Sequence, residues 1–120
     1  FLDYADRRGE LIRDRARERD IKELMIALQN YRNSSDKMQY PVPITEDVKE
    51  VCLLTAATCR DRLNFKGMVP DFILTIPSDP LADAGGNTAS YTILIDRDEK
   101  LTIYAPLSEA SFVILKEGEE

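Results

Sequence analysis

Residues 69–80 contain a short apolar run that three prolines punctuate, and they read Val-Pro-Asp-Phe-Ile-Leu-Thr-Ile-Pro-Ser-Asp-Pro. Proline fixes its own φ angle and pushes the preceding residue towards extended geometry, so Val69, Ile76 and Asp79 are biased away from helix. Four apolar side chains of this irregular segment can then reach a core, those of Phe72, Ile73, Leu74 and Ile76. We expect Phe72, Ile73 and Ile76 to cover one end of it.

The chain before this segment predicts one long helix over residues 5–33, because apolar residues recur there at helical spacing. Its second half carries a continuous apolar stripe that can pack on a sheet, formed by Ile21, Leu24, Leu28 and Tyr31. Between Arg13 and Asp20 only Ala16 is uncharged. We therefore expect the first half to project from the body as a solvated helix with pairs of opposite charge.

Residues 34–88 are expected to connect this helix to a sheet. Thr45 can cap a short second helix over residues 46–54, although the Val and Thr residues in that range also suit a strand. Alternating apolar residues then predict three strands, at 91–95, 101–105 and 112–115, within the unit 89–116. The short links between them favour an antiparallel meander. The fold class expected is α+β, with residues 1–120 forming a single domain.

Composition argues against most catalytic and nucleic-acid functions. The 120 residues have a formal net charge of −6 and contain no histidine. A histidine-free chain lacks the usual general base and the commonest zinc ligand, and we identify no catalytic residues. Acidic residues interrupt the arginines of residues 7–19, so a nucleic-acid partner is not favoured. The acidic residues Asp96, Asp98 and Glu99 fit an exposed turn better than a catalytic pair.

Two sets of residues are candidate sites. Cys52 and Cys59 are seven residues apart, which fits either two buried thiols or a disulfide formed in an oxidising compartment. Asp79, Asp83 and Asn87 could offer oxygen ligands to calcium, but their spacing is not that of an EF-hand. Acidic residues in glycine-rich turns are common, so no cofactor is expected beyond this minor calcium possibility.

Four stretches in order along residues 10–106 resemble the type IV pilins and the pseudopilins of type II secretion systems. They are Arg17-Glu18-Arg19-Asp20-Ile21-Lys22-Glu23-Leu24, Ala27-Leu28-Gln29-Asn30-Tyr31, Tyr40-Pro41 and the proline-rich residues 69–80. A looser similarity continues in the late strands, at Tyr91-Thr92 and at Leu101 to Pro106. The family's calcium loop is not recognisable.

The resemblance implies a structural subunit of a pilus or pseudopilus filament, with a role in adhesion, motility or protein secretion. Its partners would be copies of itself or related subunits. It would be extracytoplasmic, at the cell surface or in the periplasm, which favours the Cys52–Cys59 bridge. Family members are anchored in the membrane by an apolar N-terminal helix half, and we expect that half to precede Phe1.

In such a filament the charged part of the helix would face its neighbours, with an assembly face formed by Arg13, Asp14, Arg15, Arg17 and Glu18. Reversing Arg13, Arg15 and Arg17 to Glu is then expected to impair assembly and leave the domain folded. The alternative is a soluble periplasmic or surface module that does not polymerise and binds a ligand through loops at 79–90.

Overall fold

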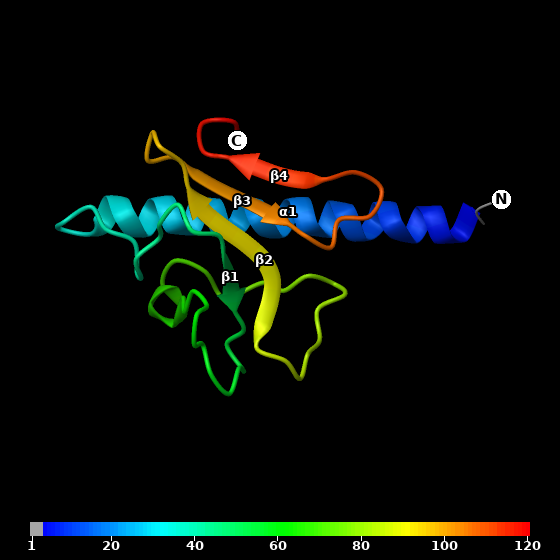
Figure 1. Ribbon diagram of the computed structural model, residues 1–120, viewed down its shortest axis with the longest axis horizontal. Coiled ribbons are helices and arrows are strands. Elements are labelled where there is room, and N and C mark those ends of the chain that lie inside the picture. The colour runs from blue at the N-terminus through cyan, green and yellow to red at the C-terminus, as the bar shows by residue number, and fades with distance from the viewer. Residues whose placement is uncertain (1–3) are drawn as a thin grey trace.

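The computed structural model describes residues 4–120, with side chains from residue 7 onwards. Helix α1, Tyr4–Ser34, packs on a four-stranded antiparallel sheet of order β1-β2-β3-β4. The strands are β1, Lys49–Cys52; β2, Thr88–Ile95; β3, Leu101–Ala105; and β4, Val113–Lys116, with a short 3-10 helix η1 at Lys66–Met68. The α+β prediction is confirmed, and the helix bounds agree with the expected 5–33 to within one residue at each end. The N-terminal turns of α1 extend beyond the sheet (Figure 1).

The predicted helix over residues 46–54 is wrong, because part of that range forms β1 and gives the sheet a fourth strand. Lys49 pairs with Ile93 and Glu50 with Thr92, so this backbone hydrogen-bonds to β2 instead of to itself. The Thr45 hydroxyl accepts a hydrogen bond only from the Asp47 N–H, which makes a local turn. The β-branched character of the segment was the better guide.

The other three strands follow the predicted meander. Ile93 of β2 lies opposite Ile103 of β3, and Ile103 lies opposite Leu115 of β4. The acidic residues between β2 and β3 form a turn in which the Asp96 carboxylate accepts the N–H groups of Asp98 and Lys100. The interpretation of this acidic cluster as a turn is therefore confirmed.

The core lies between α1 and the inner face of the sheet. The predicted helix stripe is confirmed, since Ile21, Leu24 and Leu28 are fully or almost fully buried and Tyr31 packs at the margin. The sheet supplies alternate residues of β2 and β3, which face the helix because successive strand side chains point to opposite sides. These buried residues are Ala89, Tyr91, Ile93, Leu101, Ile103 and Ala105.

Residues 69–80 form no regular helix or strand, as the prolines predict. Ile76 is buried, and Phe72 packs edge-on against Tyr31 with 5.1 Å between ring centroids. Ile73 is partly buried against the same core. Leu74 could have reached the core but is 86% exposed. The prediction that Phe72, Ile73 and Ile76 cover the end of the core is therefore confirmed.

Candidate functional site

A buried network of charged side chains joins α1 to two loops of the sheet. At its centre Arg17 is 0% exposed. Its Nε and Nη2 donate to the two carboxylate oxygens of Asp79 at 2.7 and 3.1 Å. Its Nη1 donates to Asp14 Oδ1 at 2.7 Å and lies 2.9 Å from Glu109 Oε1. Arg17 thus contacts three carboxylates from three separate parts of the chain, and the fork of its guanidinium matches Asp79 in a bidentate pair.

Asp14 fixes the loop between β3 and β4. Its carboxylate accepts the backbone N–H groups of Glu109, Ala110 and Ser111 at 3.0, 2.8 and 3.2 Å. Burial raises the pKa of Asp14, but these N–H groups and Arg17 outweigh it and hold the pKa below its ordinary value. The carboxylate is therefore charged at neutral pH. It accepts the N–H groups of this loop, which backbone carbonyl oxygens would accept in a helix or a sheet.

Glu109 closes the network on its solvent side. Arg13 donates from Nε and Nη2 to its two carboxylate oxygens, both at 2.6 Å. Hydrogen bonds from Arg13, then from Arg17, lower the pKa of Glu109 to about 2 despite the opposing effect of burial. The network contains two guanidinium groups and three carboxylates, and Asp14 also accepts backbone N–H groups. Each buried charge therefore has a partner, as burial of charge requires.

A second polar contact lies one helical turn further along α1. The Tyr91 hydroxyl donates to Asp20 Oδ2 at 2.6 Å. Burial raises the pKa of Asp20, and burial together with this hydrogen bond raises the pKa of Tyr91. The contact ties the centre of β2 to the helix. The raised pKa keeps the Tyr91 hydroxyl protonated at neutral pH, so that it remains the donor in this contact.

The network corrects the predicted assembly face. Asp14 and Arg17 are buried inside the chain, and Arg13 is half-buried against Glu109, so these residues position the helix on the sheet. Only Arg15 and Glu18 of the predicted five are exposed. Reversing both Arg13 and Arg17 to Glu would place five carboxylates together without a cation, so the expectation that the triple reversal leaves the domain folded is withdrawn.

The sequence contains a signal for this network in the spacing of its residues, which the composition of the helix does not show. Arg17 lies four residues before Ile21, seven before Leu24 and eleven before Leu28, so it continues the apolar stripe by one turn. Asp14 continues it again, three residues earlier. A charged residue at a core position implies a buried ionic partner. The partners Asp79 and Glu109, however, lie 62 and 92 residues away from Arg17 and are not specified by any local pattern.

The acid response of the network gives a first test. Because the pKa of Glu109 lies below its ordinary value of 4.5 in the folded protein, the unfolded chain binds its proton first as pH falls. We expect Glu109→Gln to be less stable than wild type at pH 7, and the difference to vanish between pH 4.5 and about 2. Urea unfolding at stepped pH measures this, with the exposed Glu46→Gln as control. A difference between Glu109→Gln and wild type that does not change with pH would contradict it.

Cys52 and Cys59 form a disulfide, which decides between the two alternatives left by the sequence. The bridge joins the end of β1 to the loop that follows it. Disulfides are typical of proteins that fold in oxidising compartments outside the cytoplasm.

The three calcium candidates each have a partner within the chain. Asp79 is held by Arg17, the Asp83 carboxylate accepts the Gly85 N–H, and the Asn87 side-chain oxygen accepts the Ala57 N–H. Within residues 4–120 no group of three or more acidic or cysteine side chains is placed to hold a metal ion.

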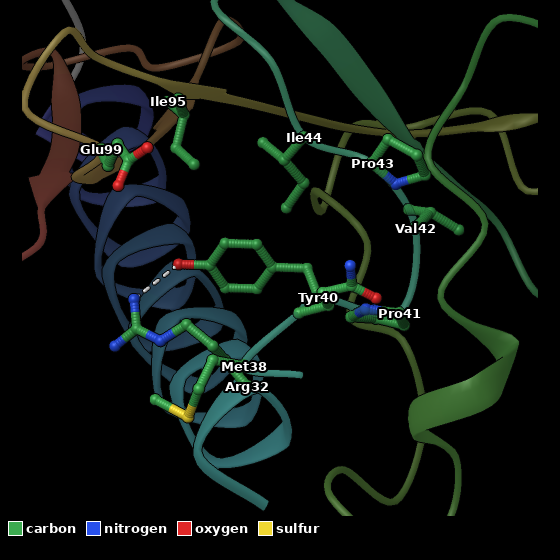
Figure 2. A pocket seen from close by; sticks show the side chains of 10 residues that line it. Arg32, Met38, Tyr40, Pro41, Val42, Pro43, Ile44, Ile95 and Glu99 are labelled. Carbon is green, nitrogen blue, oxygen red and sulfur yellow. Dashed lines mark hydrogen bonds between the residues drawn. The ribbon is translucent and has the colours of Figure 1, made fainter. Parts of the chain in front are cut away.

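A pocket of about 500 Å³ lies between the end of α1, the segment 38–44 and the β2–β3 hairpin (Figure 2). The Tyr40 ring points from that segment towards α1, where Arg32 Nη1 donates to its hydroxyl at 2.8 Å. Arg32 Nη2 also lies 3.2 Å from Glu117 Oε2. The one cation of the pocket wall is therefore already paired with a carboxylate, which reduces its attraction for an anionic ligand.

Within residues 4–120 no helix has an apolar stretch long enough to cross a membrane. No protein-family model matches the chain, and comparisons with curated proteins and with solved structures give no significant match. What the structure itself provides is a long N-terminal helix packed on a four-stranded antiparallel sheet with one disulfide, an arrangement compatible with a pilin-like fold.

Proposed function

We propose that this chain is the globular part of a filament subunit of the type IV pilin or pseudopilin kind. The observation that carries the proposal is the helix. α1 is 31 residues long, packs on the sheet by one side only, and continues beyond the sheet at its N-terminus (Figure 1). A helix that only had to complete this core would need the turns from Asp14 to Tyr31. The extra turns suit a subunit whose helix makes further contacts outside its own domain.

Two further features support the same function. The ion network fixes the direction of the helix at the point where it leaves the sheet, as an assembling subunit requires. The disulfide is compatible with export to the cell surface or the periplasm. The contacts of the described residues thus position the helix and the loops beside it. The motifs in the sequence support the same proposed function.

The alternative of a ligand-binding module in loops 79–90 gains no support from these contacts. The polar side chains that would bind a ligand there, Asp79, Asp83 and Asn87, hold the backbone or Arg17 instead.

The proposal is tested on the complete protein. We expect the reading frame upstream of Phe1 to encode about 20 consecutive apolar residues, the length that spans a bilayer. Expressed in its own cell, the complete protein should form filaments that antibodies to this domain label in electron micrographs. A reading frame without such a segment, or a surface protein that stays unassembled under conditions of secretion or pilus formation, would contradict the proposal.

A further inference from the structure

The side of α1 that faces away from the sheet carries an apolar pair between two cations. Arg8, Leu11, Ile12 and Arg15 stand at positions i, i+3, i+4 and i+7, which places them on one face of the helix. Leu11 is 47% and Ile12 59% exposed, and both arginines are exposed. We refer to these four residues as the outer stripe. Leu11 and Ile12 are neighbouring large apolar side chains, and charged residues surround them in this part of the helix.

A second exposed apolar surface lies further along the molecule, where β4 runs beside α1 (Figure 1). It is a groove of about 280 Å³, and we refer to it as the β4 groove. Its apolar residues include Ile21, Phe112, Ile114 and Leu115, of which Phe112 is 59% and Ile114 43% exposed. Its rim carries three acidic residues, Glu18, Glu119 and Glu120, and one basic residue, Lys22. β4 is the last strand of the sheet, so its outer edge is unpaired.

The two surfaces are complementary in charge and length. The outer stripe carries two cations, whereas the groove rim has a net charge of −2. The apolar pair with its flanking arginines covers about 10 Å of helix at 1.5 Å per residue. The four residues of β4 cover about 13 Å at 3.3 Å per residue. The whole stripe, from Arg8 to Arg15, is therefore similar in length to β4, so its two arginines can lie at the ends of the groove near the acidic rim.

Charge is distributed in the same way along the whole chain, with a basic helix and an acidic remainder. Tyr4–Ser34 contains eight basic and six acidic residues, a net charge of +2, while residues 35–120 contain eight basic and fifteen acidic residues, a net charge of −7. A contact that placed the sheets of two copies against each other would bring two acidic surfaces together. A contact between the helix of one copy and the sheet of another brings opposite charges together.

We propose that the outer stripe of one copy docks in the β4 groove of a second copy. Because the two surfaces are different, each bound pair of copies leaves one stripe and one groove free, and the contact repeats in a row instead of closing as a dimer. The contact rests on the proposed filament function and names the surfaces through which neighbouring globular domains would touch.

The test uses two variants that each remove one surface: Ile12→Asp for the stripe and Ile114→Asp for the groove. Sedimentation at rising concentration should give species larger than a dimer for the wild type. Each variant alone should associate at least about tenfold more weakly, because an apolar contact becomes a buried charge. Mixed in equal amounts the variants should form dimers and nothing larger, since one supplies an intact groove and the other an intact stripe.

Two controls keep this result interpretable. Ile26→Asp changes an exposed apolar residue of the same helix face outside the stripe and should leave association intact. Glu119→Arg changes an exposed residue of the groove rim without touching the core, so it weakens association at low salt even if Ile114→Asp fails to fold. A wild type that stays monomeric, one that stops at a dimer, or a mixture no better than its components would overturn the proposal.

Failure of this contact is distinguishable from failure of the filament function. Normal filaments from a complete protein that carries Ile12→Asp would exclude the contact and leave the filament function standing. Repeating association of this chain, together with a complete protein that never assembles in its cell, would establish the contact and exclude the function.

Discussion

Replacing Arg17 by Met is expected to lower the free energy of unfolding by about 3–5 kcal/mol, the usual cost of removing one partner of a buried ion pair. Among the described residues Arg17 is the only cation that contacts Asp79, so the change leaves that fully buried carboxylate without its bidentate partner. It also removes a partner of Asp14 and Glu109. Since a domain of this size has a total stability of about 5–15 kcal/mol, the variant should be close to unfolding at growth temperature. Urea unfolding followed by circular dichroism measures the loss.

Arg15→Met is the matched control, because Arg15 is exposed and lies two residues away on the same helix. Its effect should stay within about 0.5 kcal/mol, as is usual for surface substitutions. Combining Arg17→Met with Asp79→Leu should recover part of the loss, since the fully buried carboxylate of Asp79 is then no longer left without a cation. Equal stabilities of Arg17→Met and Arg15→Met would show that the network does not hold the helix.

Removing the disulfide is expected to cost about 2.5 kcal/mol, the loop-closure entropy of a bridge that joins residues seven apart. The variant is Cys52→Ala with Cys59→Ala, in which alanine avoids a buried hydroxyl at position 52. Thermal unfolding compares it with the wild type. The end of β1 should loosen first, because the bridge connects that strand to the following loop.

Reduction of the wild type provides the control for this substitution. A reductant should lower the melting temperature of the wild type towards that of the double variant and leave the variant unchanged. If the double variant were as stable as the oxidised wild type, the bridge would not contribute to the fold. A reductant effect on the double variant would point to an unrelated cause.

The sequence predicted those parts of the fold that depend on local pattern. The stripe of Ile21, Leu24 and Leu28 placed the helix on the sheet, and the alternation in residues 91–95 and 101–105 predicted two of the strands. β1 was missed because a four-residue strand is too short to show its period, and its pairing with β2 joins residues more than 35 positions apart. Residues 69–80 were correctly predicted to be irregular, since proline geometry acts on neighbouring residues alone.

The ion network was harder to predict for a different reason. The density of charge around Arg17 suggested a solvated face, and only the helical phase shared with Ile21 contradicts that interpretation. Asp79 and Glu109 are single acids in loops, and nothing nearby distinguishes them from the exposed acids of other turns. Their role depends on where the loops pass over α1, which is a property of the folded chain. The sequence thus predicted the backbone arrangement well and the partners of its charged residues poorly.

The position of the ion network along α1 has a mechanical consequence. From Leu28 to Arg13 the helix is held over about 22 Å, and it continues beyond the network from Arg13 to Tyr4 for about 14 Å at 1.5 Å per residue. If only the apolar stripe from Ile21 onwards held it, the anchored length would fall to about 10 Å. The same small displacement of the helix at the sheet would then move its N-terminal end by a larger distance. The ion network of Arg13, Asp14 and Arg17 therefore about doubles the anchored length and limits the angle through which the N-terminal end of the helix can swing.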